Sequence, residues 1–153
     1  MSVTYQIEPW SSELSEEMMP LWVAHWLEVG MDHEAVPLDP DFEAIWTEAL
    51  ANRLRILTVR KDGNLVGYHI SKILRPWHYK STLCAFVDAY YLAESHRKGF
   101  AGVRMFKEAE RDLASIGVKK MYSFCKLGHD HGRIFERLGY VESEREFTKV
   151  IGE

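Results

Sequence analysis

The stretch Ser95–Gly102, which reads SHRKGFAG, joins an apolar run to an amphipathic segment and contains two cations and two glycines. Glycine lets a backbone approach a ligand closely, and the first turn of a helix presents free N–H groups at the positive end of the helix dipole. A strand, a glycine loop and a helix in this order therefore predict an anion site that suits phosphate. Arg97 and Lys98 would add charge for a diphosphate. A tight turn from strand to helix also favours glycine, so a purely structural role is the alternative.

Two common nucleotide motifs do not fit this stretch. A dinucleotide fingerprint requires GxGxxG spacing within an early βαβ unit, and a P-loop requires GKS or GKT. Neither pattern occurs in the sequence. An anion site at this loop would therefore belong to another class.

Hydrophobic periodicity predicts an α/β domain with a mixed sheet and the element order β-α-α-β-β-β-α-β-α-β. Strand 81–92 is nearly all apolar, which indicates a central position with both faces buried. A first helix is predicted to begin at Ser11 or Ser12 and to end before the loop 29–40. The other predicted strands are 3–9, 55–61, 65–74, 118–126 and 141–151, and the other predicted helices are 41–54, 100–116 and 128–140.

Composition limits the class of protein. The 153 residues suit a single domain, 1–153, and no apolar run is long enough to span a bilayer. The first residues lack the pattern of a signal peptide, so we expect a cytoplasmic protein in which Cys84 and Cys125 are buried free thiols. A net charge of −4 argues against general nucleic-acid binding. We expect neither nucleic acid nor membrane as a partner.

The charge is unevenly placed along the chain. Residues 1–52 contain 11 Asp or Glu and no Lys or Arg, whereas the remaining residues carry a net charge of +7. The first segment would raise the local concentration of a cationic ligand, and the second would attract an anion. Solubility alone is the alternative explanation for several of the acids.

Two motifs resemble the GNAT superfamily of N-acetyltransferases. The segment 87–124 is similar to its acyl-CoA-binding segment, whose signature is Gln/Arg-x-x-Gly-x-Gly/Ala. The matching residues are His96-Arg97-Lys98-Gly99-Phe100-Ala101, with His96 departing from the first position. The segment 134–147, IFERLGYVESEREF, resembles the family's late helix, and its ending resembles small phage-encoded members. The resemblance implies a GNAT-like, mostly antiparallel sheet flanked by about four helices.

The resemblance also implies acetyl-CoA as co-substrate, without a metal. Backbone N–H groups from Lys98 to Val103 would hold the pyrophosphate of coenzyme A. The strand end Ala89–Leu92 would pair with the pantetheine arm, and an N–H group there would stabilise the oxyanion. The cofactor-binding residues expected on this basis are Tyr90, Tyr91, Leu92, Arg97, Lys98, Gly99, Phe100, Ala101, Gly102 and Val103.

Three residues are candidates for catalysis. Asp88 is the only charge in its strand, and a buried carboxylate there would have a raised pKa and serve as a base or acceptor contact; a structural ion pair is the alternative. Tyr91, or its neighbour Tyr90, could reach the thioester, unless both tyrosines only pack in the core. His78 lies in a loop that borders the acceptor cleft in this family. Phe135 stands where the family usually has a tyrosine that protonates the sulfur.

The remaining histidines give little indication of a catalytic or metal-binding role. His129 and His131 flank Asp130, which is more simply a helix cap than part of a metal site, because no third and fourth ligands can be identified. His25 is expected to be packed and hydrogen-bonded.

The predicted function is transfer of an acetyl group from acetyl-CoA to a primary amine by direct attack on the thioester. The charge asymmetry favours a cationic acceptor, either a small molecule such as a polyamine or aminoglycoside, or a lysine-rich protein segment. The alternative is a catalytically idle acyl-CoA-binding module that regulates or assembles with a partner. A homodimer is left open.

Overall fold

A computed structural model describes residues 2–152 and contains one five-stranded sheet in the order β1-β2-β3-β4-β5. Neighbouring strands run antiparallel except β4 and β5, which are parallel. The predicted mixed, mostly antiparallel α/β fold is confirmed. The strands are β1 Val3–Ile7, β2 Leu54–Lys61, β3 Asn64–Leu74, β4 Cys84–Leu92 and β5 Lys120–Tyr122.

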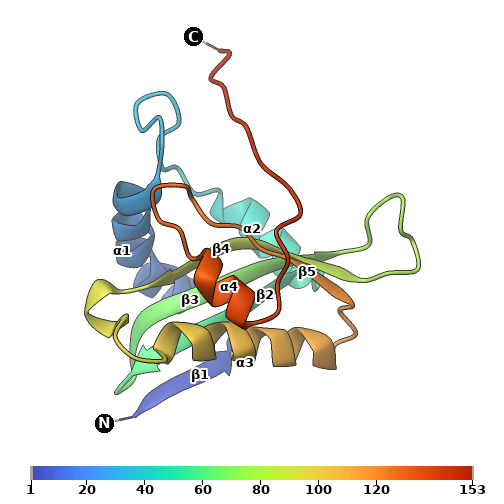
Figure 1. Cartoon of the computed structure of the whole chain (residues 1–153). Helices are drawn as coiled ribbons and strands as arrows, with labels where there is room; N and C mark the ends of the chain where they lie inside the picture. Colours follow the sequence, from blue (N-terminus) through green and yellow to red (C-terminus); the bar gives the residue numbers. More distant parts are fainter. Residues whose placement is uncertain (1, 153) are drawn as a thin grey trace.

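Four helices cover the two faces of the sheet. In Figure 1, α1 (Ser12–Val29) and α2 (Phe42–Leu50) lie behind the sheet, and α3 (Ala101–Ser115) and α4 (Gly132–Arg137) lie in front. A short 3₁₀ turn, η1 (Glu94–His96), precedes α3. Two apolar clusters separate the layers. The cluster on the α1 side contains Trp10, Leu14, Met18, Ile56, Tyr68 and Ile70, and the cluster on the α3 side contains Leu57, Val59, Val66, Leu92, Met105, Phe106, Ala109 and Phe135.

The prediction of a last strand over residues 141–151 is wrong. This segment is extended and exposed, but it pairs with no strand in the described chain. The physical reason is that a β-strand needs a hydrogen-bonded neighbour, and the segment runs away from the sheet after α4 (Figure 1). β5 is also shorter than its predicted range, α4 is the short helix expected within 128–140, and Cys125 is half-buried rather than buried like Cys84.

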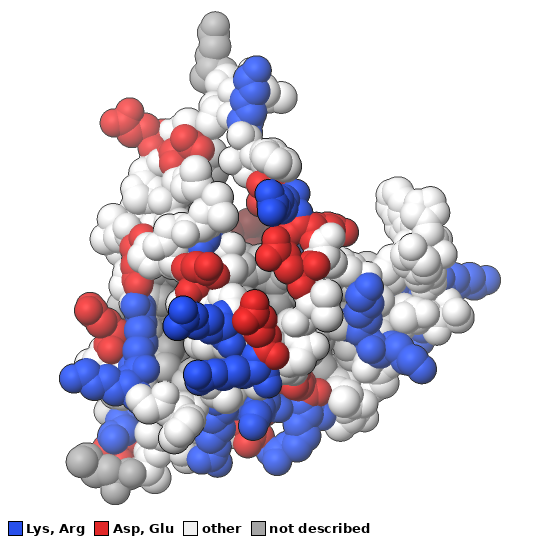
Figure 2. Space-filling view, in the orientation of Figure 1, with Lys and Arg blue, Asp and Glu red and all other residues white. Residues whose placement is uncertain are grey.

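Charge is distributed unevenly over the surface. Figure 2 shows Lys and Arg gathered in the lower part of the view, where Figure 1 places α3 and the loop before it. Over residues 2–152, no helix is long and apolar enough to cross a membrane.

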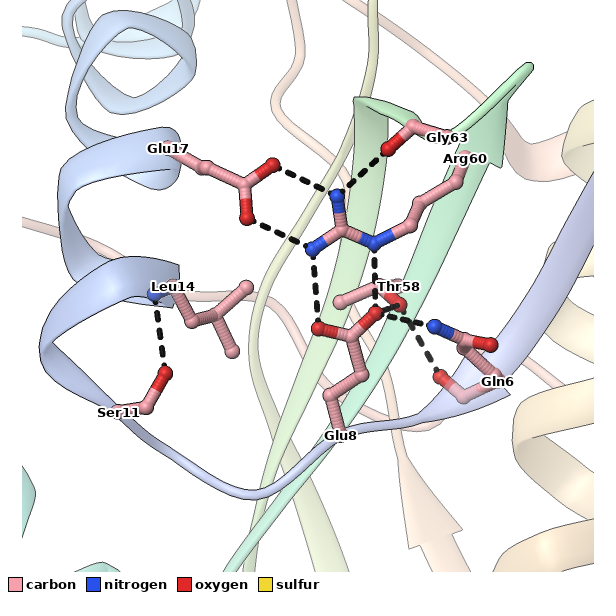
Figure 3. A network of polar contacts seen from close by, with 8 residues as sticks. All are labelled: Gln6, Glu8, Ser11, Leu14, Glu17, Thr58, Arg60 and Gly63. Atoms are coloured by element: carbon pink, nitrogen blue, oxygen red, sulfur yellow. Dashed lines mark hydrogen bonds and ion pairs between the residues drawn. The ribbon is translucent and has the colours of Figure 1, made fainter.

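A network around Arg60 fastens α1 to the sheet (Figure 3). The Arg60 guanidinium donates to both oxygens of Glu8, at 2.7 and 3.0 Å, and to both oxygens of Glu17 on α1, at 2.9 and 2.6 Å. Thr58 donates a further bond to Glu8 at 2.7 Å. Hydrogen bonds from Arg60 lower the pKa of Glu8 to about 2. The network sets the position of α1, whose far end lies at the candidate site described below.

We expect Arg60→Met to lower the free energy of unfolding by about 2 kcal/mol at pH 7, because it leaves the largely buried Glu8 carboxylate without its counter-ion. Arg60 depresses the folded-state pKa of Glu8, so this stability is present above pH 4.5 and lost as the pH falls toward 2. Urea unfolding at pH 7 and pH 3 measures both effects.

Glu17→Gln is the matched control, because the Glu17 side chain is 41% exposed and its removal should cost under about 1 kcal/mol. Equal losses for the two variants, or a loss in Arg60→Met that does not shrink at pH 3, would contradict this account of the network.

Candidate active site

β4 and β5 separate partway along their length, and this opening is the centre of the candidate site. Their pairing ends at Phe86 and Tyr122, although β4 continues to Leu92. Where β4 pairs with β3, Val87 lies opposite Ser71 and Ala89 opposite Ile70, so Asp88 is an extra residue in a β-bulge. Bulges bend a strand and end regular pairing. The bulge therefore coincides with the point at which β4 leaves β5.

The last residues of β4 have free backbone groups along the opening. The Ala93 N–H donates to Val66 of β3 at 2.8 Å. Backbone direction alternates along a strand, so Tyr91 also points its N–H toward β3, whereas Tyr90 and Leu92 point theirs toward the side that β5 has left. These two N–H groups are available to an extended ligand or to an oxyanion.

The glycine loop ends at an uncapped helix beside the same strand end. Ser11 and Asp41 cap α1 and α2 with their side chains, and each of those helices has an acid in its first turn. α3 has no side-chain cap and no acid in its first turn, so its N–H groups and dipole are uncompensated. Gly99 has φ +80°, and a Cβ at Gly99 or Gly102 would meet no atom within 4 Å. The surface above the loop is open to a ligand.

Arg97 does not lie free over this loop. Its Nε donates to the Leu92 carbonyl at 2.6 Å, and its two Nη atoms donate to the Glu28 carboxylate at 2.5 and 2.6 Å. The guanidinium also lies 5.3 Å from the centre of the Tyr91 ring. Hydrogen bonds from Arg97 lower the pKa of Glu28. Arg97 thus joins the end of α1 to the end of β4. Exposed Lys98, by contrast, forms no ion pair with any residue in the range 2–152.

His25 and Tyr91 form the α1 side of the opening. The His25 Nδ1 lies 2.7 Å from the Tyr68 hydroxyl, and its ring stacks on Tyr91 with centroids 5.1 Å apart. Burial lowers the pKa of His25 to about 4, so its imidazole is neutral at pH 7. The packed, hydrogen-bonded histidine predicted from the sequence is confirmed. Its place beside Tyr91 was not predicted, because no local pattern links residues so distant in sequence.

Aromatic side chains form the α4 side of the opening. Phe135 is 9% exposed and packs edge-on to Tyr90, with centroids 6.1 Å apart, and against Phe106. The Tyr90 hydroxyl donates to the Phe124 carbonyl at 2.7 Å, and burial raises the pKa of Tyr90. Phe135 has no hydroxyl, and the phenols packed against its ring belong to Tyr140, at 5.3 Å between centroids, and to Tyr90 on β4, at 6.1 Å.

Asp88 and His78, two of the predicted catalytic residues, do not lie where the sequence analysis expected them. Asp88 is not buried: its side chain is 46% exposed and lies 3.2 Å from Lys72, because the bulge turns it toward solvent. His78 is exposed in the hairpin between β3 and β4. That hairpin precedes β4, whereas the glycine loop follows it, so a strand of roughly 30 Å separates them. The structure does not bring His78 together with Tyr91 and Asp88.

The histidines before α4 form no metal site. The Asp130 carboxylate accepts the Gly132 N–H at 2.7 Å, but the N-cap of α4 is His131, one residue later than the cap expected from the sequence. His129 lies 3.9 Å from Glu28. No group of three or more His, Cys, Asp or Glu side chains in the described range 2–152 is arranged to hold a metal ion.

A hollow of about 350 Å³ lies elsewhere, between α2 and the β1–β2 side of the sheet. Its lining includes Trp10, Trp46 and Arg55 but no residue of β4. It is therefore separate from the opening between β4 and β5.

Comparisons with known proteins agree with this geometry. The model of the acetyltransferase (GNAT) family matches residues 11–140. No curated protein sequence matches the chain significantly. An aminoglycoside acetyltransferase from an uncultured soil metagenomic sample, solved with trehalose, superposes with a TM-score of 0.76 at 12% identity, covering 98% of this chain and 97% of that one.

Two further solved structures are similar. Ribosomal-protein-alanine N-acetyltransferase from Brucella melitensis biovar Abortus 2308 has a TM-score of 0.72 at 17% identity and covers 99% of this chain and 100% of its own. A predicted acetyltransferase from Clostridium acetobutylicum, solved with acetyl-CoA, has a TM-score of 0.75 at 8% identity, with 97% and 96% covered. At these identities the structural likeness shows the fold alone.

The buried histidines predict a loss of stability in mild acid. Burial lowers the folded-state pKa of both His25 and His69 to about 4, whereas unfolded histidine titrates near 6.5. The unfolded state therefore binds more protons between these values, and stability falls as the pH drops from 6.5 toward 4. We expect each of these two histidines to lower the free energy of unfolding by up to about 2 kcal/mol when the pH falls from 7 to 5. Urea unfolding of the wild type and His25→Gln measures this, and the variant should lose less; an identical pH dependence would contradict it.

Proposed function

Since the chain belongs to the GNAT family of acetyltransferases, we propose that it transfers an acetyl group from acetyl-CoA to a primary amine. Acetyl-CoA is the co-substrate of this family. The observation that carries the proposal is the uncapped, acid-free N-terminus of α3 beside the opening between β4 and β5. This arrangement offers one site for an anionic nucleotide and, next to it, free strand N–H groups for an extended arm.

The proposed cofactor contacts are mostly backbone groups. The pyrophosphate would bind the N–H groups from Lys98 to Val103, where no side chain competes for the helix start. The pantetheine arm would lie along β4 and bond to Tyr90 and Leu92 as an added strand does. Arg97 has a different role in this proposal from the one expected. Its engagement with Glu28 and Leu92 suits it to hold the strand end in place.

The proposed reaction is a direct attack of a neutral amine on the thioester carbonyl. The new C–N bond forms, a strand N–H group at Tyr90 or Leu92 stabilises the oxyanion, and the C–S bond then breaks. Tyr91 and neutral His25 line the α1 side, where both would contact the amine and the His25 imidazole would accept its proton. Tyr90, on the opposite side, takes the place of the missing late-helix phenol in protonating the thiolate or relaying water to it.

The test is release of the coenzyme A thiol from acetyl-CoA in the presence of a polyamine, an aminoglycoside, a lysine-rich peptide and a neutral amine. Acceptor-dependent thiol release supports the proposal. Tight coenzyme A binding without release on any amine would instead support the idle binding module, the function that the buried Phe135 favours.

We still propose a cationic acceptor, as the charge asymmetry predicts. In the structure, however, fewer of the acids of residues 1–52 can support this proposal. Four acids of residues 1–52 pair with three arginines, which compensate most of their charge; they are Glu8, Glu17, Glu28 and Glu48. The acids of loop 30–41, which follows directly after the Glu28 end of α1, form no ion pair among the described residues; they are Asp32, Glu34, Asp39 and Asp41. Exposed Asp88 adds no free charge to this group, because Lys72 lies 3.2 Å from its carboxylate.

For the cofactor site, Gly102→Asp should raise the dissociation constant of coenzyme A at least about tenfold. A carboxylate in the first turn of α3 would satisfy the dipole and repel the pyrophosphate. The fold should be no less stable, since glycine is a poor helix residue and its Cβ would meet open space. Calorimetry with coenzyme A measures affinity, and thermal unfolding measures stability.

Gly102→Asn is the control of matched shape without charge, and we expect it to weaken binding less than about threefold. If the Gly102→Asp variant is folded and binds coenzyme A as tightly as the wild type, the start of α3 is not part of the cofactor site.

For the acceptor, the double variant Asp32→Asn/Glu34→Gln should raise the KM of a cationic amine about three- to tenfold at low salt and leave coenzyme A affinity unchanged. The difference should disappear near 0.5 M salt, where screening is strong. The matched control is Glu13→Gln/Glu16→Gln, which removes two charges at the other end of α1. An equal effect of both pairs, or turnover only with neutral or acidic amines, would refute a local cationic subsite.

A further inference from the structure

The hollow between α2 and the β1–β2 side of the sheet has the size and lining of a small-molecule site. Its volume is about 350 Å³. Sites for small ligands enclose roughly 300–1,000 Å³ and combine apolar or aromatic walls with a few polar groups that fix the ligand's orientation. The hollow has both kinds of lining, and no residue of the proposed acetyl-CoA site contributes to it.

Two tryptophans supply aromatic walls of the hollow. Trp10 is 8% exposed and is held in place by stacking on Trp22 and Phe42, with ring centroids 5.9 and 6.3 Å away. On α2, Trp46 and Leu50 are 44% and 72% exposed. In α2, which lies wholly within residues 2–152, no side chain is buried. A flat apolar ligand in the hollow would cover these exposed side chains and stack on an indole ring.

A stretch of free strand edge supplies polar groups. The pairing of β1 with β2 ends at Ile7 and Leu57, and one further bond joins the Glu8 N–H to the Ile56 carbonyl at 3.1 Å. Backbone groups of alternate residues point to the same side of a strand. The N–H of Ile56 and both backbone groups of Leu54 therefore face this edge as well. Within residues 2–152 these three groups make no hydrogen bond. The edge thus presents N–H donors beside a carbonyl acceptor.

The two charged residues that line the hollow are already paired, which favours a neutral ligand. Arg55 binds both oxygens of Asp112, at 2.7 Å each, through Nε and Nη2; its Nη1 makes no hydrogen bond within the described chain. Glu8 accepts hydrogen bonds from Arg60 through both of its oxygens. A charged ligand would lose its hydration without meeting a free counter-ion. A neutral acceptor atom could still use the Nη1 of Arg55.

We propose that the hollow is a second ligand site, which binds a small, neutral aromatic carboxamide. The ring would pack against Trp10 and Trp46. The amide would place an acceptor at the Ile56 N–H and a donor at the Leu54 carbonyl, because a carboxamide carries both groups side by side. Such a ligand would also bridge α2 and β2. The inference is independent of the proposed acetyl transfer, since it concerns a different part of the molecule.

An NMR titration of the full chain with naphthamide, a neutral aromatic carboxamide, tests this proposal. We expect saturable shifts of the backbone N–H groups of Leu54 and Ile56 and of the Trp46 indole N–H. The dissociation constant should be about 1 mM or lower for a ligand of this size. Naphthoate and naphthylmethylammonium carry the same ring with a negative or a positive charge, and each should bind at least about tenfold more weakly. Absence of saturable naphthamide shifts, equally tight binding of a charged probe, or shifts centred on β4 would overturn the proposal.

Substitutions in the hollow separate specific binding from adsorption to exposed aromatic rings. Trp46→Ala should unfold at a temperature close to that of the wild type, because the side chain is not buried, and should bind naphthamide at least about tenfold more weakly. Leu50→Asp is a second variant that removes no buried surface, and its carboxylate should also weaken binding. Trp77→Ala is the matched control: Trp77 is 98% exposed in the hairpin between β3 and β4 and does not line the hollow, so affinity should not change. Unchanged affinity in folded Trp46→Ala and Leu50→Asp, or an equal loss in Trp77→Ala, would contradict a site in the hollow.

Discussion

The divergence of β4 from β5 is the constraint on which the candidate site depends. Parallel pairing holds the two strands together as far as Phe86 and Tyr122, and the bulge at Asp88 then turns β4 away. Had the pairing continued, the N–H groups of Tyr90 and Leu92 would be used within the sheet. Because it stops, they remain available at the point where α3 begins with an uncapped end. The interruption thus supplies the strand edge of the proposed acyl-CoA site, and the uncapped start of α3 supplies its proposed phosphate end.

α1 is held at two points by arginines from distant elements. Arg60 of β2 binds Glu17, and Arg97 of the glycine loop binds Glu28, so the helix is fixed both in its first half and at its end. This explains how His25 and Glu28 are placed beside Tyr91. It also means that Glu28 already compensates the charge of Arg97, so the phosphate site that we propose at the loop would rely on backbone N–H groups and Lys98.

The features predicted correctly from the sequence depend on neighbouring residues. The cap at Ser11, the glycine loop and the apolar faces of the helices are local patterns, and they recover the fold. The expectation that Asp88 is buried was wrong because the bulge that exposes it depends on its register with β3, which periodicity does not reveal. Strand 141–151 was predicted from real alternation, but a strand forms only where a partner edge is in reach. The Arg97–Glu28 pair was missed because its residues are 69 positions apart.

The central claim is that the start of α3 and the free edge of β4 together bind coenzyme A. Backbone amide NMR during a titration with coenzyme A tests it most directly, because each proposed contact is an N–H group. The account predicts saturable shifts of the amides from Lys98 to Val103 together with those of Tyr90 and Leu92, at one dissociation constant. Shifts confined to the exposed cations of α3, with the β4 amides unmoved, would contradict it.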